Sequence, residues 1–310
     1  MPGRLLDSVR AAAALTSNSA HFVKVQDDTI EQYAASLPLE AARAPTLDPA
    51  THFLGDLDST LAYVVQLDAI NFGSGYFPKL KKRPGLSGYF TVASCLKEVF
   101  AAHGQLTSRQ LQSLSQVDCA GMFGQEFGAD AAVDELMGLF AAALNALGGY
   151  VGARFGGSFG ALVESARGSA EELVGILVEM PFYQDVGFYK RAQLTAADLS
   201  VAQVATFGDL DRLTIFADNL VPHVLRVDGI LQYEPDLLDR INREELIPSG
   251  STEEREIRAG AVHAVELIRE ALHRRTHAVT SMELDYVLWN RGQQPAYKSQ
   301  SRHRTRTVFY

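Results

Sequence analysis

The chain has few of the features that would place it at once in a well-marked class. Its 310 residues contain two cysteines, Cys95 and Cys119. Both stand in apolar surroundings, which predicts buried, reduced thiols in a cytosolic protein rather than a disulfide or a metal site. The metal-binding patterns His-Glu-x-x-His and Cys-x-x-Cys do not occur, and neither does a phosphate-binding Gly-x-x-x-x-Gly-Lys-Ser/Thr loop. We therefore expect no metal and no cofactor.

Positive charge and long apolar runs are also scarce. The net charge is −9, and no basic stripe runs along the chain, so a stable complex with nucleic acid is not expected. The short apolar run Ala11–Leu15 lacks the pattern of a signal peptide. No apolar stretch reaches about 18 residues without a polar break, so we expect no membrane span. These absences predict a cytoplasmic protein.

What the sequence does contain is helical periodicity. Hydrophobic residues make up 47% of the chain and charged residues 21%, as in an ordinary soluble protein. Helices are predicted over Ser87–His103 and Asp130–Leu147, and after the cap-like residues Thr107, Ser169, Ser251 and Thr280. Phe22–Val25 is a short strand candidate. The prediction is a mainly α, single domain over 1–310 with few short strands, and residues 1–130 are a candidate N-terminal subdomain.

One segment, Phe216–Arg226, places charged groups among apolar ones. Asp218 lies two residues after Phe216, and Arg226 follows eight residues later. Burying a charge costs several kcal/mol unless it is paired, so an unpaired buried charge usually serves a functional site. Asp218 is therefore a candidate site residue, with a buried structural ion pair as the alternative.

A second cluster follows Thr280. Asp285 and Trp289 are four residues apart, so they share a helix face. With Tyr286 and Asn290, they would place an acid, an indole, a phenol and an amide along one helix edge, which suits a flat aromatic ligand. In the alternative interpretation Trp289 lies in the core and Asp285 is exposed.

Three further segments are weaker candidates. Asn71 and Phe72 stand where a helix ends in a glycine turn, so the backbone could approach a ligand closely there, and a polar helix cap is the alternative. Lys190 and Arg191 lie beside two aromatic residues and are followed by Asp198. The two cations could hold an anion or a base, and a solvated helix start is the alternative. The tail Arg302–Thr307 is basic, and its default interpretation is disorder. If docked, its residues Arg304 and Arg306 could bind a phosphate.

Together these segments resemble the queuosine salvage family, the queuosine 5′-phosphate N-glycosylases/hydrolases. The matching pieces occur in order along nearly the whole chain: Leu67–Phe72, Phe188–Gln193, Leu213–Asp218, Val221–Arg226, Glu256–Arg258, Val265–Arg269, Leu284–Trp289 and His303–Tyr310. The resemblance implies a fold similar to helix-hairpin-helix DNA glycosylases. It also implies hydrolysis of the N-glycosidic bond of queuosine 5′-monophosphate, which releases queuine for salvage into tRNA modification.

The resemblance gives the candidate residues their roles. Asp218 would act near the anomeric carbon, either as nucleophile, by activating water or by electrostatic stabilisation. Asp285, Tyr286 and Asn290 would hold the edge of the base, and Phe216 and Trp289 would stack on it. Lys190, Arg304 and Arg306 would bind the 5′-phosphate. His52 is matched to a histidine of the family's pocket. The family often has a second acid where this chain has Asn290, so the amide would have to bond the base differently.

Two other functions remain open at this point. A DNA or RNA base-excision glycosylase is disfavoured by the negative charge, because duplex contact requires basic residues that displace counterions. A non-catalytic queuine-binding protein would use the same pocket without turnover. The expected partner in the leading interpretation is a small-molecule nucleotide and its queuine product.

Overall fold

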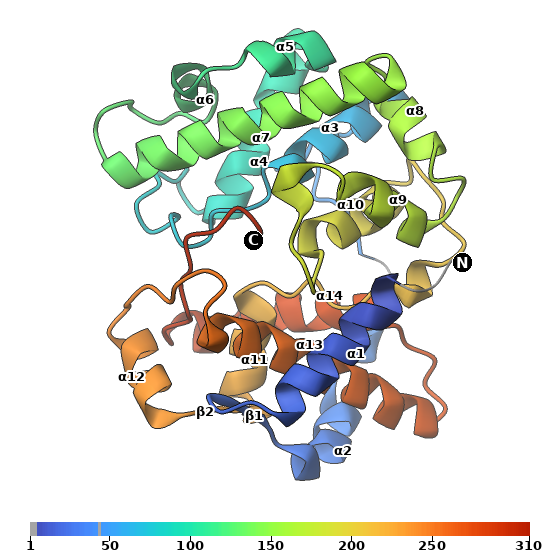
Figure 1. Cartoon of the computed structure of the whole chain (residues 1–310), viewed down its shortest axis with the longest axis vertical. Coiled ribbons are helices and arrows are strands. Elements are labelled where there is room, and N and C mark those ends of the chain that lie inside the picture. Colours follow the sequence, from blue (N-terminus) through green and yellow to red (C-terminus); the bar gives the residue numbers. More distant parts are fainter. Residues whose placement is uncertain (1–4, 43–44) are drawn as a thin grey trace. The chain divides into compact units, whose positions relative to one another are not determined.

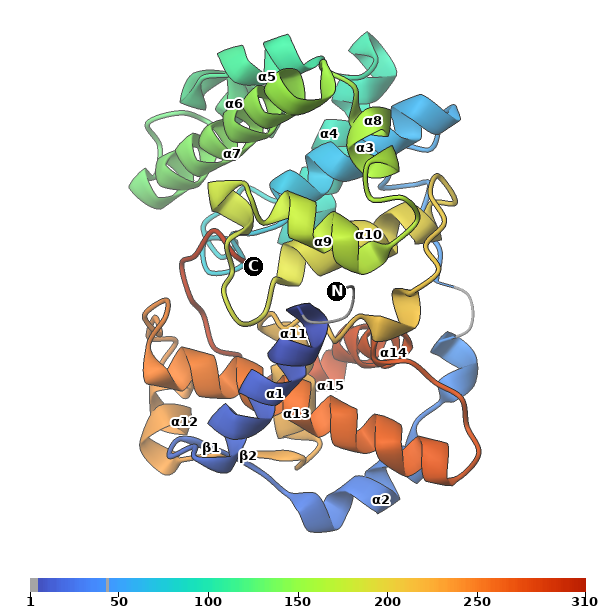
Figure 2. The ribbon, with the colours of Figure 1, turned by 45° about the vertical axis from the view of Figure 1, so that its right-hand side comes forward.

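The computed structural model describes residues 5–42 and 45–310 and is mainly helical (Figures 1 and 2). Over these residues it has fifteen α-helices and one two-stranded antiparallel sheet, which confirms the predicted fold class. The chain forms two compact units that alternate along the sequence. Unit 1 comprises the described residues up to Pro45, Val186–Lys190 and Asp209–Arg306, and unit 2 comprises Thr46–Asp185, Arg191–Gly208 and Thr307–Tyr310. The single domain, the 1–130 subdomain and the likeness to helix-hairpin-helix glycosylases stay predictions.

Unit 1 is organised around one long helix, α13. Its elements are α1 (Leu5–Asn18), β1 (Val23–Val25), α2 (Asp27–Ser36), η1 (Leu39–Ala42), η3 (Leu210–Arg212), α11 (Leu220–Val227), β2 (Leu231–Tyr233), α12 (Pro235–Asn242), α13 (Thr252–Arg274), α14 (Ser281–Gly292) and α15 (Pro295–Lys298). Helices α1, α2, α11 and α14 all contact α13. The predicted apolar face of α13, including Ile257, Val265 and Ile268, is buried. Burying this face against four helices is what stabilises α13.

Unit 2 is organised around α7, the long green helix of Figure 1. Its elements are α3 (Leu57–Ala69), α4 (Gly88–His103), α5 (Ser108–Ser113), α6 (Gln116–Met122), α7 (Ala131–Phe155), α8 (Phe159–Glu164), α9 (Ala170–Leu177), η2 (Pro181–Tyr183) and α10 (Lys190–Val201) from its second residue onward. Helices α3, α5, α6 and α8 contact α7. Gly148 permits the close approach of α5, because a Cβ there would lie 2.5 Å from the backbone oxygen of Ser108.

Among the described residues, α7 is also the one helix long and apolar enough to cross a membrane, and half of its most apolar window is buried inside the structure. Its half-buried polar residue Asn145 donates hydrogen bonds to the backbone oxygens of Leu111 (2.6 Å) and Leu114 (3.1 Å). These contacts are those of a core helix. The absence of a membrane span stays a prediction.

The predicted caps are largely confirmed. Thr107 and Thr280 form complete capping boxes, and the hydroxyl groups of Ser169 and Ser251 accept hydrogen bonds from the third residue of their helices. The glycine-rich run 154–160 contains a Gly-x-Ser-x-Gly sequence. It joins α7 to α8, however, and Ser158 caps α8, so it lacks the strand-to-helix turn of a nucleophile elbow.

The two cysteines are buried and free, as predicted. Both lie in unit 2, Cys95 on α4 and Cys119 on α6. Burial raises the pKa of the Cys119 thiol to about 12. These thiols therefore behave as small apolar side chains.

Candidate active site

Asp218 lies two residues before the start of α11 in unit 1. Its Oδ1 atom accepts hydrogen bonds from the backbone N–H groups of Leu220 (2.7 Å) and Val221 (3.4 Å). Unpaired N–H groups and the helix dipole both stabilise a negative charge at this end of a helix. The side chain is half-buried, and its Oδ2 atom accepts no hydrogen bond from the described part of the chain. One oxygen is thus fixed by the helix, and the other is available to a ligand.

Asp285, on α14, is a second carboxyl group close to Asp218. It is 4% exposed, and its Oδ1 atom accepts a hydrogen bond from the backbone N–H of Phe216 (2.9 Å). Desolvation and the charge of Asp218 raise the pKa of Asp285 to about 8, against the opposing effects of the Phe216 hydrogen bond and Lys190. At neutral pH the group is therefore largely a neutral acid that can donate a hydrogen bond.

Lys190 reaches this pair from a third segment. It is buried, begins α10 and interacts electrostatically with Asp285. The residue before it, Tyr189, has φ 50°, in the left-handed region that a bulky side chain rarely adopts. Gly187, two residues earlier, has φ 94°. The chain thus turns sharply just before Lys190, and such strain persists only where the surrounding structure enforces it.

The aromatic candidates lie close to the acids, but the amide candidate does not. Phe216 is buried, and its ring meets that of Tyr286 edge-on, with centroids 6.4 Å apart. Trp289 is half-buried, one helical turn after Asp285, whereas Asn290 is exposed. Five residues along a helix correspond to a rotation of about 140° from Asp285. The structure therefore does not bring Asn290 to the face that carries Asp285.

The basic tail is docked rather than disordered. Burial alternates over residues 302–307 as in an extended segment, with the odd-numbered side chains buried and the arginines outward. The backbone oxygen of Arg304 accepts a hydrogen bond from Ile247 N–H (2.8 Å), and its guanidinium makes two hydrogen bonds of 2.9 Å to Glu244. Arg306 is exposed. Arg304 therefore already has a carboxylate partner.

Asp218 interacts electrostatically with Arg302, a tail residue that the sequence did not single out. Desolvation lowers the pKa of Arg302, and Asp218 opposes that shift. The residue is nevertheless exposed to solvent. The buried carboxamide of Asn219 also contacts the tail, since its Nδ2 lies 3.5 Å from the backbone oxygen of His303. In the sequence, Arg302, Arg304 and Arg306 stand at every second position. In an extended segment this spacing places the three arginines on one face.

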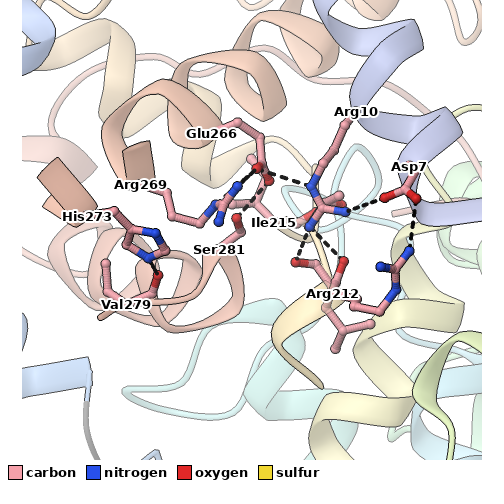
Figure 3. Close-up of polar contacts among 11 residues, drawn as sticks. Asp7, Arg10, Arg212, Ile215, Glu266, Arg269, His273, Val279 and Ser281 are labelled. Carbon is pink, nitrogen blue, oxygen red and sulfur yellow. Dashed lines mark hydrogen bonds and ion pairs between the residues drawn. The ribbon is translucent and has the colours of Figure 1, made fainter. Parts of the chain in front are cut away.

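A polar network in unit 1 connects the segments that carry the two acids (Figure 3). Glu266, on α13, accepts hydrogen bonds from the hydroxyl of Ser281 (2.7 Å), at the start of α14, and from Arg269, and lies 3.1 Å from Nε of Arg10. Arg10 in turn donates to the backbone oxygens of Arg212 (2.7 Å) and Leu213 (3.1 Å). The helix of Asp285 and the segment leading to Asp218 are therefore held by linked contacts.

Comparison with known proteins identifies the family. The model of the family described as queuosine salvage protein matches residues 51–310. The chain belongs to the queuosine salvage protein family. A relative from Sphaerobacter thermophilus, named queuosine 5′-phosphate N-glycosylase/hydrolase, is 35% identical over 308 residues, which cover 94% of each chain. A Mus musculus protein of the same name is 30% identical and covers 98% of each chain, and one from Dictyostelium discoideum is 36% identical over half of this chain.

The part of the chain that matches the family model contains every candidate residue, including four in unit 2. There, His52 is buried in a network in which Nε2 lies 2.9 Å from the Tyr89 hydroxyl and Nδ1 lies 3.1 Å from that of Thr51. Burial lowers the pKa of His52, which favours the neutral ring. Both ring nitrogens already have partners, an arrangement typical of a structural histidine. Its role in the family's pocket stays a prediction.

Of the other three unit 2 candidates, Asn71 and Phe72 follow the end of α3, where a buried arginine contacts the backbone, and Asp198 lies on α10. Phe72 packs in the core, and the guanidinium of Arg191 lies 4.9 Å from the centre of its ring. Arg191 also donates to the backbone oxygens of Asp68, Ala69 and Phe182. Asn71 is half-buried and Asp198 is buried. Because two of these oxygens lie at the end of α3, Arg191 fixes the turn that carries Asn71 and Phe72.

Proposed function

We propose that this chain hydrolyses the N-glycosidic bond of queuosine 5′-phosphate. Water adds to the anomeric carbon, the bond to the base nitrogen breaks, and queuine and ribose 5-phosphate are released. The pairing of a helix-bound carboxylate, Asp218, with a buried neutral acid, Asp285, is the observation that carries the proposal. Membership of a family whose relatives are named for this reaction supports it.

The two acids fit the two charge changes of the reaction. The transition state resembles an oxocarbenium ion, so positive charge develops on the sugar. In the proposal, Oδ2 of Asp218 faces that charge and stabilises it. Negative charge develops on the departing base, which as a 7-deazaguanine has no nitrogen at position 7 to protonate. Asp285 assists the departure by donating a hydrogen bond to the base, which a protonated carboxyl can do and a carboxylate cannot.

In the proposal, the surrounding charged and aromatic groups determine which end of the nucleotide lies at each acid. Lys190 acts on Asp285, which we assign to the base end of the substrate, together with the rings of Phe216, Tyr286 and Trp289. Arg302 acts on Asp218, which we assign to the sugar end. We therefore assign the 5′-phosphate contact to Arg302 in preference to Lys190 and to Arg304, whose guanidinium is held by a carboxylate.

Mass spectrometry after incubation with the 5′-phosphate tests the proposal. Free queuine and ribose 5-phosphate should appear in equal amounts, and queuine should appear faster than it does from the unphosphorylated nucleoside. Tight binding of queuine without bond cleavage would instead indicate a carrier protein. Retention of duplex DNA or RNA at physiological salt, with no nucleotide hydrolysis, would indicate a base-excision enzyme.

The proposed biological setting is salvage of queuine for tRNA modification in the cytoplasm. Two free, buried thiols are in keeping with a reducing compartment. Fractionation of cells that produce the tagged protein tests the location.

A further inference from the structure

A buried arginine on α13, Arg258, lies behind the segment that carries Asp218. Its side chain is 3% exposed, and Nε donates a 2.8 Å hydrogen bond to the backbone oxygen of Ala217, the residue directly before Asp218. One face of the guanidinium lies over the ring of Phe188, 4.0 Å from its centre. Phe188 is two residues before Lys190. One side chain thus contacts both segments that bring charge to Asp285.

The charge of Arg258 is balanced from its own helix. Its Nη1 atom lies 3.3 Å from Oε1 of Glu254, one turn earlier on α13, and that carboxylate is as deeply buried as the guanidinium. Desolvating two charges offsets much of their attraction, so apolar replacements of such pairs are often no less stable. A gain in the stability of the whole protein therefore does not explain this ion pair well. The contacts of Arg258 with Ala217 and Phe188 indicate a role in placing these two segments.

We propose that Arg258 is a positioning residue for the hydrolysis of the proposed nucleotide substrate, and that it sets how Asp218 and Lys190 lie around Asp285. The inference rests on the proposed function. The planar guanidinium stacks on Phe188 with its face while its edge donates to Ala217 and Glu254. A lysine ammonium has the charge but neither the plane nor the fixed donor directions. Arg258 makes no substrate contact in this proposal and acts through the two segments.

Steady-state kinetics of Arg258→Lys tests the inference. A displacement of about 1 Å in a reacting group can cost roughly 100-fold in rate. We expect kcat to fall by about 10- to 100-fold, with KM within about twofold of wild type and cooperative thermal unfolding retained. The control is Arg240→Lys. Arg240 lies on α12, and its Nη1 is 2.9 Å from Oε1 of Glu253 in the first turn of α13. This change should leave kcat unchanged.

A second variant keeps the test decisive if Arg258→Lys does not fold. Phe188→Leu leaves both polar contacts of Arg258 in place and removes the ring on which it stacks; kcat should fall by several-fold at constant KM. Folded variants that both retain wild-type kcat would overturn the positioning role while leaving the proposed function intact. A wild-type protein that releases no queuine would overturn the proposed function itself.

Discussion

Replacing Asp285 by Asn tests the electrostatics of the candidate site most directly. The amide has the shape of the carboxyl group and can still accept the hydrogen bond from Phe216 N–H. What it loses is the titrating proton. A comparison of the two proteins across pH therefore isolates the cost of ionising a carboxyl group in this buried position, 4% exposed and close to Asp218.

The size of the effect follows from the raised pKa. Burial and Asp218 raise the pKa of Asp285 from 3.8 to about 8. Below the lower value the group is neutral in both the folded and unfolded chain. Between the two values only the unfolded chain has released the proton, so stability falls as pH rises, and above the higher value the loss is complete. The slope is about 1.4 kcal/mol per pH unit, which gives on the order of 4 kcal/mol at neutral pH.

Chemical denaturation at several pH values between about 5 and 9 measures this difference. We expect the free energy of unfolding of Asp285→Asn, relative to wild type, to increase by about 1.4 kcal/mol per pH unit and to level off above about pH 8. Asp211→Asn, a change at an exposed acid, should show no such trend. A difference between Asp285→Asn and wild type that does not vary with pH would mean that Asp285 is ionised in the folded protein, and the role of neutral acid would be lost.

Three other changes have distinct expected outcomes. Asp218→Asn should retain the fold, because Asn caps helices as well as Asp does, but kcat should fall at least about 100-fold by the product assay; near-normal turnover would remove it from the mechanism. Arg302→Met should raise KM for the 5′-phosphate about 10-fold or more without affecting the nucleoside, whereas Arg304→Met should not; equal effects on both substrates would contradict the phosphate assignment. Gly148→Ala should lower the free energy of unfolding by about 1–3 kcal/mol through a clash with a backbone oxygen of α5, and Gly149→Ala, which enters open space, should not; a stable Gly148→Ala would show that α5 can move aside.

The sequence predicted local structure well because local structure depends on near neighbours. The hydroxyl of Thr280 and the carboxylate of Glu283 cap α14 from within four residues, and the apolar spacing along α13 matches its buried face. It also selected Asp218 and Asp285, since an acid in an apolar segment stands out without any knowledge of the fold. Helical spacing was less reliable for Asn290, which the prediction grouped with Asp285 although five residues place it on a different side of the helix.

What the sequence by itself determined is the helical class, the caps, the buried thiols and the residues that suggest a nucleotide glycosidase. Tertiary structure decided which of those residues act on one another. It placed Asp285 close to Asp218, which is 67 positions away in the sequence. It also formed the ion pair between Arg304 and Glu244 and the hydrogen bond from Arg258 to the backbone oxygen of Ala217. Desolvation and Coulomb interactions depend on distance through space, so a protonation state or an ion pair is set only once the folded chain has brought these groups together.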